Sequence, residues 1–336
     1  MSSVLYITSD RTGAGKTTLC TAIAHKLINL GKTVSVFKPL SAEPNNGQDE
    51  RGTYKDLVNL ATSKWPIAVP EKGIDAHIIK EICVTADQVK GSNDILIVEG
   101  LPTISIEDTN RIIEALDATL LSVVEYSSEL SPSNLEGWSK IDSDRFVGIV
   151  INKMTIYAST DLNHNVLIDL QKREVPVLGV IPENRTLLGV SVKQLADYLG
   201  GKLIDFGNDS GDLVESVMVG GMWMDAGEVH FGLRNDKAVI VRGDRPDIQM
   251  AALGTSTSCL VLTGDIEPIE YILNEARESE TPIITVATDT LSTMENISEL
   301  PRTALFDHSK KLREFSLLLD NHVELESIYQ KLGAIT

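Results

Sequence analysis

The chain has few cysteines, no long apolar run and no basic segment at its amino terminus. Three cysteines occur among 336 residues, at Cys20, Cys83 and Cys259. An odd number of widely spaced thiols excludes a disulfide framework and is typical of reduced cysteines in a cytosol. The absence of an apolar stretch of about 18 residues excludes a membrane-spanning helix. We therefore expect a cytoplasmic protein without a signal peptide.

Basic side chains are scarce relative to acidic ones. The chain has 30 Lys and Arg against 48 Asp and Glu, a formal net charge of −18. Such a surface repels nucleic-acid phosphates and anionic membranes, so we expect neither as a partner. Any anion that binds needs a local, preorganised site. The six histidines show no spacing typical of a zinc site.

The length and composition indicate a folded chain of about two domains. Short β-branched runs alternate with amphipathic stretches, which predicts a parallel α/β sheet with helices on both faces. The expected strands are Val4–Thr8, Thr33–Phe37, Ile95–Val98, Leu120–Val124, Val147–Ile151 and Val177–Ile181.

A Gly-, Asp- and Asn-rich segment at 207–213 interrupts this pattern and is typical of a linker. We expect a first domain at 1–206 and a second, smaller α/β domain at 214–336. Its expected strands are Val214–Val219, Ala238–Val241, Cys259–Thr263 and Ile283–Val286, and two helices are expected to follow, at 307–321 and 323–332.

A glycine-containing loop separates the first expected strand from the first expected helix. It has the sequence Ser-Asp-Arg-Thr-Gly-Ala-Gly-Lys-Thr-Thr, from Ser9 to Thr18. In this context backbone N–H groups and a helix N-terminus point at a phosphate, while Lys16 reaches its oxygens and Thr17 binds Mg²⁺. The first glycine of the standard phosphate loop is replaced by Asp10. The alternative is an ordinary glycine turn. The expected ATP-binding residues are Gly13, Ala14, Gly15, Lys16, Thr17 and Thr18.

Charged side chains follow the next expected strands. Lys38 ends the second strand, where open α/β sheets bind ligands, although it also fits an exposed lysine before a proline. Glu99 ends the third strand, where an acid typically orients Mg²⁺. A further acid for the metal is expected between residues 49 and 56, with Asp56 favoured and Asp49 as the alternative.

Two later strands also end in polar or turn residues. Asn152 ends the strand at 147–151, and its amide offers the donor and acceptor that a purine edge requires. Pro182 ends the following strand, and we assign it to the nucleotide side with Asn152. Without the phosphate loop, both would fit ordinary turn residues.

The order of these motifs resembles a known family. Gly-Lys-Thr at 15–17, Val-Phe-Lys-Pro at 36–39, Val-Glu-Gly at 98–100, Ile-Asn-Lys at 151–153 and Leu-Gly-Val-Ile-Pro-Glu-Asn at 178–184 resemble the N-terminal nucleotide-binding domain of long phosphotransacetylases. That domain is similar to dethiobiotin synthetase and to cobyrinic acid a,c-diamide synthase. The second block resembles the DRTGG domain that follows it. Its best matches are residues 239–247 and 260–265.

The resemblance implies roles for particular residues. Lys16 and Thr17 would hold phosphate and Mg²⁺, Lys38 would supply substrate-side charge, and Glu99 with Asp56 would hold the metal. Thr12 and Ser41 match polar positions near the phosphates and the substrate, and Asn152 matches the adenine position. The catalytic set that this implies is Lys16, Lys38, Thr12 and Ser41.

Two function classes follow. The first is an ATP-binding sensor or regulatory partner without acetyltransferase activity, because the acetyltransferase domain of the family is expected to be missing. The second is an ATP- and Mg²⁺-dependent ligase-like enzyme that phosphorylates a small carboxylate or carbamate. The intact Lys16, Thr17, Lys38 and Glu99 keep the second class open.

The second domain is expected to mediate self-association, as a homodimer or a higher homo-oligomer. Met218, Met222, Trp223 and Met224 suit a packed core or interface. Asp244-Arg245-Pro246-Asp247 fits either a turn and helix start or a ligand or subunit contact. Arg245 is the residue expected to reach an anion across a two-fold axis.

Overall fold

In the computed structural model, the expected strands of the first block form one sheet. The structure describes residues 3–41, 50–60, 67–68, 73–102, 104–127, 130, 137, 141–155, 166–204, 206, 213–221, 227–298, 300 and 304–335. Contacts divide the chain into two units. Unit 1 comprises Met1–Glu183 and Phe306–Thr336, and unit 2 comprises Asn184–Leu305.

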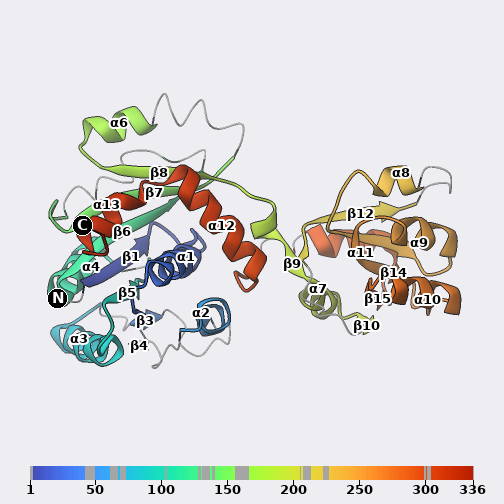
Figure 1. Ribbon diagram of the computed structural model, residues 1–336, viewed down its shortest axis with the longest axis horizontal. Helices are drawn as coiled ribbons and strands as arrows, with labels where there is room; N and C mark the ends of the chain where they lie inside the picture. The colour runs from blue at the N-terminus through green and yellow to red at the C-terminus, as the bar shows by residue number, and fades with distance from the viewer. Residues whose placement is uncertain are drawn as a thin grey trace. The chain divides into compact units, whose positions relative to one another are not determined.

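Unit 1 is built on a six-stranded sheet in the order β2-β5-β1-β6-β7-β8, in which all neighbouring strands are parallel (Figure 1). The strands are near-continuous apolar runs, as expected for a sheet that is buried on both faces. They are β1 (Ser3–Ser9), β2 (Val34–Phe37), β5 (Ile95–Glu99), β6 (Ala118–Glu125), β7 (Phe146–Met154) and β8 (Val177–Pro182). A separate parallel pair is formed by β3 (Leu40–Ser41) and β4 (Ile67–Ala68).

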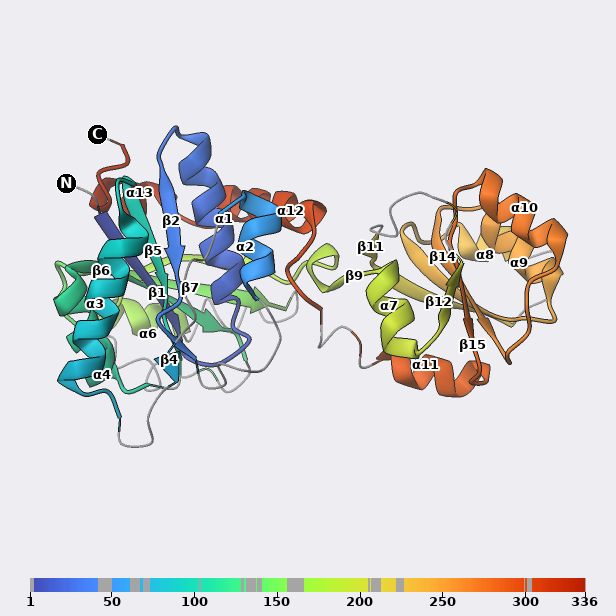
Figure 2. The same ribbon diagram turned by 90° about the horizontal axis from the view of Figure 1, so that it is seen from below.

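Helices cover both faces of this sheet (Figures 1 and 2). One hydrophobic cluster joins alternate strand residues, such as Tyr6 and Val98, to α3 (Ala76–Lys90), α4 (Ile106–Leu116) and α6 (Leu167–Lys172). The helix α1 (Lys16–Asn29) contacts β1, β2, β5 and α12 (Ser309–His322), while α12 and α13 (Leu325–Lys331) contact β8 and β7. The expected two-sided α/β architecture is confirmed.

The two C-terminal helices pack on unit 1, so the domain boundaries differ from those expected from the sequence. Glu324 donates a backbone hydrogen bond to Leu178 of β8 at 2.8 Å, and Lys26 of α1 pairs with Asp320 of α12 at 2.6 Å. A Cβ on Gly179 would lie 2.0 Å from the carbonyl oxygen of His322, so this approach requires glycine. Unit 2 is therefore an insertion between β8 and α12.

Unit 2 is a smaller three-layer unit. Its sheet has the order β10-β15-β14-β13-β12, parallel except for the antiparallel pair of β10 and β15. Because β10 pairs with β15, the segment from Asn184 to residue 206 belongs to unit 2 and not to the first domain that the sequence predicted. The strands are β10 (Lys202–Ile204), β12 (Ser216–Gly220), β13 (Lys237–Arg242), β14 (Thr257–Thr263) and β15 (Ile283–Val286). Residues 207–212 of the expected linker lie outside the described residues.

Two apolar clusters cover the faces of the second sheet. One contains residues of α8 (Gly227–Phe231), α9 (Pro246–Leu253) and α10 (Glu270–Glu278). The other contains residues of α7 (Val192–Leu199), α11 (Thr290–Ser298) and the small antiparallel pair of β9 (Val190–Ser191) and β11 (Leu213–Val214). The prediction of a second, smaller α/β domain is confirmed, and its bounds are those of unit 2.

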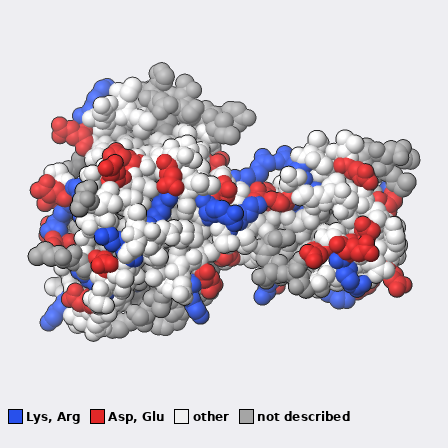
Figure 3. Space-filling view, viewed as in Figure 1, with Lys and Arg blue, Asp and Glu red and all other residues white. Residues whose placement is uncertain are grey.

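No helix in the described ranges is long and apolar enough to cross a membrane. On the face that Figure 3 shows, acidic and basic side chains are interspersed.

Candidate functional site

The turn from β1 to α1 forms an open phosphate loop. Gly13 and Gly15 adopt positive φ angles of 78° and 103°, which other residues reach only with strain. Gly15 caps α1, and the helix has no side-chain cap and no acidic residue in its first turn. By contrast, Asp75 caps α3 and Ser191 caps α7. The first N–H groups of α1 and its positive dipole end are therefore left for an anion.

Lys16 is buried at the start of α1. Its ammonium donates a hydrogen bond to the Ser9 hydroxyl at 3.0 Å, and Ser9 in turn donates to the carbonyl of Arg11 at 2.6 Å. Burial lowers the pKa of Lys16, while the nearby Glu99 carboxylate opposes that shift. The side chain is thus held beneath the loop, next to the strand end that carries Glu99.

Glu99, at the end of β5, joins three elements. Its Oε1 accepts a hydrogen bond of 2.8 Å from the Thr17 hydroxyl of α1, and its Oε2 accepts one from the phenol of Tyr54. The Lys38 ammonium lies 3.9 Å from Oε1. Glu99 is 1% exposed, so these partners replace the water that a carboxylate otherwise requires.

Tyr54 lies on α2 (Glu50–Val58) and was not expected from the sequence. Burial, with the neighbouring Cys20 and Glu99, raises the pKa of its phenol well above the usual range. Burial also raises the pKa of the Cys20 thiol, which contacts the phenol. Tyr54 therefore stays protonated and acts as a hydrogen-bond donor to Glu99. Nothing in the polar sequence around it distinguishes this tyrosine from a core residue.

Asn152, at the end of β7, braces the loop. Its side-chain amide donates to the carbonyl of Ala14 at 2.9 Å, and its oxygen accepts from the backbone N–H of Lys153. A Cβ on Gly15 would lie 2.3 Å from its Nδ2 atom. Asn152 is thus placed at the phosphate loop, with both polar atoms engaged by the protein. Its contact with adenine stays a prediction.

Two neighbouring residues complete this side of the loop. Lys153 has a φ of 61°, and its ammonium donates to the carbonyl of Gly13 at 2.7 Å and to the Glu125 carboxylate at 3.1 Å. Asp10, which replaces the usual first glycine, accepts from the backbone N–H of Glu125 at 3.1 Å and pairs with Arg11 at 2.8 Å. The departure from the standard motif therefore ties the loop to the end of β6.

The structure brings together five of the expected residues, because β2, β5 and β7 end at the carboxyl edge of the sheet and α1 begins there after β1. They are Lys16, Thr17, Lys38, Glu99 and Asn152. Ser41 lies half-buried in β3, Thr12 is exposed in the loop, Thr18 lies in the first turn of α1, and Pro182 ends β8. Their roles stay predictions.

The geometry does not bring Asp56 to the metal position. Asp56 is exposed on α2, two residues beyond Tyr54. Residues two positions apart in a helix lie about 200° apart around its axis. A helix that turns Tyr54 toward Glu99 therefore turns Asp56 toward solvent. Asp49, the alternative, lies outside the described residues.

The donors that are present fit a magnesium ion bound together with a nucleotide. The described residues contain no cluster of three His, Cys, Asp or Glu side chains that could hold a metal ion. Mg²⁺ next to a nucleotide needs no such cage, because it keeps several waters and takes oxygens from phosphates and one or two side chains. The Thr17 hydroxyl and the Glu99 carboxylate are hard oxygen donors next to the anion-binding end of α1.

In unit 2, Arg245 is engaged within its own chain. Its guanidinium donates to both carboxylate oxygens of Asp247, at 2.9 and 2.6 Å. This pair raises the pKa of Arg245 and lowers that of Asp247. The 244–247 motif therefore starts α9, and a contact of Arg245 across a two-fold axis stays a prediction. Residues 222–226, with Met222, Trp223 and Met224, lie outside the described residues.

The family follows from a comparison with known sequence families. A model described as an AAA domain matches residues 3–191, more than half of the chain. The chain belongs to this AAA-domain family. A second model, for the DRTGG domain, matches residues 194–300, within the limits of unit 2.

Curated relatives extend this assignment. The chain is 22% identical to a phosphate acetyltransferase of Nitrosomonas europaea over 361 residues, which cover 98% of this chain and 51% of the relative. It is 22% identical to a cobyrinate a,c-diamide synthase of Herminiimonas arsenicoxydans, over 55% of this chain and 39% of the relative. The chain thus spans about half the length of the phosphate acetyltransferases that it matches. The resemblance expected from the sequence is confirmed.

Solved structures show partial likeness. A cobyrinic acid a,c-diamide synthase from Mycobacterium smegmatis with bound ADP and magnesium is 17% identical, with a TM-score of 0.38, over 55% of this chain and 88% of that chain. The CBS and DRTGG domains of a Clostridium perfringens pyrophosphatase are 16% identical, with a TM-score of 0.30, over 46% of this chain and 74% of that chain.

Proposed function

We propose that unit 1 binds Mg-ATP and that the protein acts as a nucleotide-dependent sensor or regulatory partner. The observation that carries the binding proposal is the 2.8 Å hydrogen bond from Thr17 to Glu99, which links the uncapped start of α1 to a buried carboxylate 82 residues away. Lys16 and the N–H groups of α1 would receive the phosphates, and Thr17 and Glu99 would hold the metal. Mg²⁺ supplies charge neutralisation of the phosphates when it is bound.

The regulatory part of the proposal rests on the insertion of unit 2. Both chain connections of unit 2 join unit 1, one after β8 and one before α12. The strand β8 neighbours β7, which carries Asn152, and α12 contacts α1, which carries Lys16. A change at the nucleotide site is therefore connected to both ends of the inserted unit through packed elements.

Calorimetry with Mg-ATP tests the binding proposal. Thr17→Ala and Glu99→Gln should each weaken the binding of Mg-ATP, and chelation of Mg²⁺ should remove most of the difference between these variants and the wild type. Thr119→Ala in β6 is a matched control on the same sheet. Loss of affinity in Thr17→Ala that persists unchanged without Mg²⁺ would contradict the metal role.

Hydrogen exchange tests the regulatory part. We expect Mg-ATP to change the protection of amides in 194–300 as well as those at the loop, because both connections of unit 2 join packed elements of the site. Protection that changes within unit 1 alone would contradict a sensor role.

We also propose that the nucleotide site does not transfer acetyl groups. The Cys20 thiol, which contacts Tyr54, is buried with a raised pKa and so remains a protonated, poor nucleophile. An assay of the purified chain should show no acetyl phosphate formed from acetyl-CoA and phosphate. Formation that scales with protein and disappears in Lys16→Met would overturn this proposal.

A second candidate function is ATP-dependent phosphorylation of a small carboxylate. The position of Lys38 favours it, because its ammonium lies 3.9 Å from Glu99 and its side chain is 24% exposed, so that it reaches both the metal position and solvent. A ligase-like enzyme should release ADP faster when a carboxylate substrate is added, and Lys38→Met should abolish the increase. A set of small carboxylates that leaves ADP release unchanged would favour the sensor.

Self-association through unit 2 is also proposed. Two large apolar side chains are strongly exposed, Val229 of α8 at 74% and Leu233, two residues after the end of α8, at 73%. Exposed apolar patches of this kind often mark protein contacts. Light scattering should show a dimer or higher oligomer that Val229→Asp with Leu233→Asp reduces to a monomer. A wild-type monomer at all concentrations would contradict association.

A further inference from the structure

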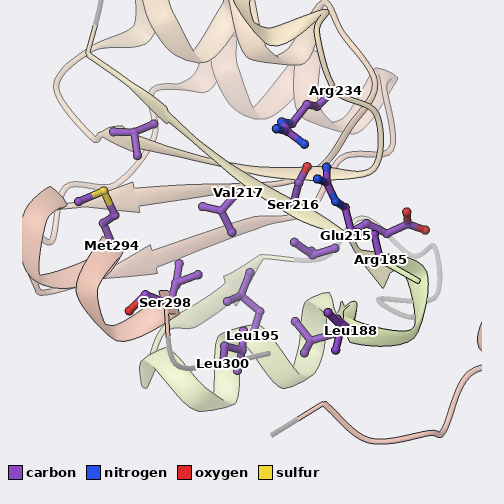
Figure 4. A pocket seen from close by; sticks show the side chains of 14 residues that line it. Arg185, Leu188, Leu195, Glu215, Ser216, Val217, Arg234, Met294, Ser298 and Leu300 are labelled. Atoms are coloured by element: carbon purple, nitrogen blue, oxygen red, sulfur yellow. The ribbon is translucent and has the colours of Figure 1, made fainter. Parts of the chain in front are cut away.

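Unit 2 contains a pocket with a volume of about 450 Å³ (Figure 4). This volume lies in the range of small-molecule sites, about 300 to 1,000 Å³. Its walls come from β9, β11, β12, α7 and α11, and every residue that lines it belongs to unit 2.

The inner wall of the pocket is part of the hydrophobic core. Val190, Leu195 and Ile297 line it and are at most 5% exposed. Towards the opening the apolar surface continues on Val217 and Met294, which are 37% and 41% exposed. An apolar ligand would therefore continue the core and remove exposed apolar area from water.

Two arginines lie at one end of the pocket. Arg185 and Arg234 both line it, and Figure 4 shows their guanidinium groups near Ser216, whereas Met294 and Leu300 lie towards the other end. Among the described residues, neither guanidinium has a hydrogen-bond or ion-pair partner. The Ser216 hydroxyl at this end is buried and also makes no hydrogen bond to any described residue. The chain has a net charge of −18. Two such guanidinium groups beside the buried Ser216 hydroxyl therefore form a local site that favours an anion.

Glu215 lies at the same end and lines the pocket as well. In Figure 4 its carboxylate lies away from Met294 and Leu300, and its Oε1 atom is buried. The three charged side chains leave one net positive charge there. Two guanidiniums and a hydroxyl provide enough donors for one anionic group, since a carboxylate, phosphate or sulfonate accepts several hydrogen bonds at once.

We propose that this pocket binds a small amphipathic anion, with an apolar body against Leu195 and Ile297 and one carboxylate, phosphate or sulfonate group at Arg185 and Arg234. The anionic group of the ligand would pair with the two guanidinium groups. Its apolar body would cover the continuous apolar wall, which a purely ionic ligand would leave exposed to water. The site does not depend on nucleotide binding in unit 1, and its occupant would be an effector of the inserted unit.

The experiment compares two probes on the full chain without nucleotide. The anionic probe is 8-anilinonaphthalene-1-sulfonate, and the neutral probe is N-phenyl-1-naphthylamine, which shares its ring system and lacks the sulfonate. Fluorescence titration should show one saturable sulfonate site per chain. Arg185→Gln combined with Arg234→Gln should weaken the sulfonate about tenfold or more and leave the neutral probe within about twofold. Octanoate should compete with the sulfonate.

Two further variants locate the site. Val217→Trp should fill the pocket and weaken both probes, while circular dichroism shows that the fold persists. Arg242→Gln is a matched control, because Arg242 pairs with Asp244 and does not line the pocket. Lys16→Met should leave both probes unchanged, which separates this proposal from nucleotide binding.

Several outcomes would overturn the proposal. Equal sulfonate affinity in the wild type and the double arginine variant would remove the anion end. Probe binding that Val217→Trp leaves intact would place the site elsewhere. Probe binding that falls as protein concentration rises, together with growing mass in light scattering, would assign the pocket to a second copy of the chain.

Discussion

The phenol of Tyr54 donates a hydrogen bond to the carboxylate of Glu99, from a helix 45 residues earlier in the chain. Glu99 has its other oxygen on Thr17, so one buried carboxylate joins α2 to the start of α1. The position of the phosphate loop therefore depends on a residue outside the loop.

Replacement of Tyr54 by Phe should remove this bond and leave a buried carboxylate oxygen without its donor. We expect the free energy of unfolding of unit 1 to fall by about 1–3 kcal/mol and Mg-ATP binding to weaken. Urea unfolding and calorimetry measure the two effects. Tyr271→Phe, at an exposed position of α10, should change neither. Wild-type stability and affinity in Tyr54→Phe would show that the bond is dispensable.

Replacement of Gly15 by Ala should impair the loop more than replacement of Gly13. Both glycines have positive φ angles, but a Cβ on Gly15 would meet Asn152 at 2.3 Å, whereas one on Gly13 would meet nothing within 4 Å. Gly13→Ala should thus cost about 1 kcal/mol of backbone strain, and Gly15→Ala should also displace the loop and abolish Mg-ATP binding. Asn152→Ala added to Gly15→Ala should recover part of the stability. Equal effects of the two glycine variants would contradict this account.

Replacement of Gly179 by Ala should loosen the C-terminal segment from unit 1. The new Cβ would lie 2.0 Å from the backbone oxygen of His322, which cannot move without breaking the contact with β8. Limited proteolysis should then cleave within 306–336 faster than in the wild type. Gly221→Ala is a suitable control, because its Cβ would meet nothing within 4 Å. Unchanged cleavage in Gly179→Ala would show that the segment is held by other contacts.

Lys311 of α12 should make the stability of unit 1 depend on alkaline pH. Burial lowers its pKa to about 8, against about 10.4 in an unfolded chain. The unfolded state therefore binds more protons between these values, so stability rises with pH from about 8 to about 10.4. Lys311→Met should stabilise unit 1 by up to about 3 kcal/mol at pH 7, and the gain should shrink as pH approaches 10. Urea unfolding at both pH values checks this, and a gain independent of pH would contradict it.

The strands of the first sheet were predictable, because each is a near-continuous apolar run bounded by polar residues. The run at 95–98, for example, is β5 with Glu99 added at its end. Lys16, Thr17 and Glu99 were predictable from their positions at strand ends and in the glycine loop. These features are local in the sequence, so periodicity and motif spacing are sufficient to find them.

The features that were missed depend on contacts between distant segments. The helix at 309–322 has an amphipathic pattern, but the pattern does not say that its apolar face covers the first sheet and not the second. Gly179 was the one residue in the sequence that could have indicated this contact, because the backbone of β8 approaches that of His322 there. Tyr54 was missed and Asp56 was expected at the metal for a related reason, because the sequence does not tell which face of α2 turns towards Glu99.

Calorimetric titration of Mg-ATP into the wild type and Lys16→Met tests the central claim most directly. Lys16 is the buried cation beneath the phosphate loop, and methionine keeps its length without its charge. Wild-type protein should bind one Mg-ATP per chain, Lys16→Met should bind it at least about tenfold more weakly, and Lys80→Met, an exposed control on α3, should match the wild type. Equal affinity of the wild type and Lys16→Met, or no binding by either, would contradict the assignment of this loop as a nucleotide site.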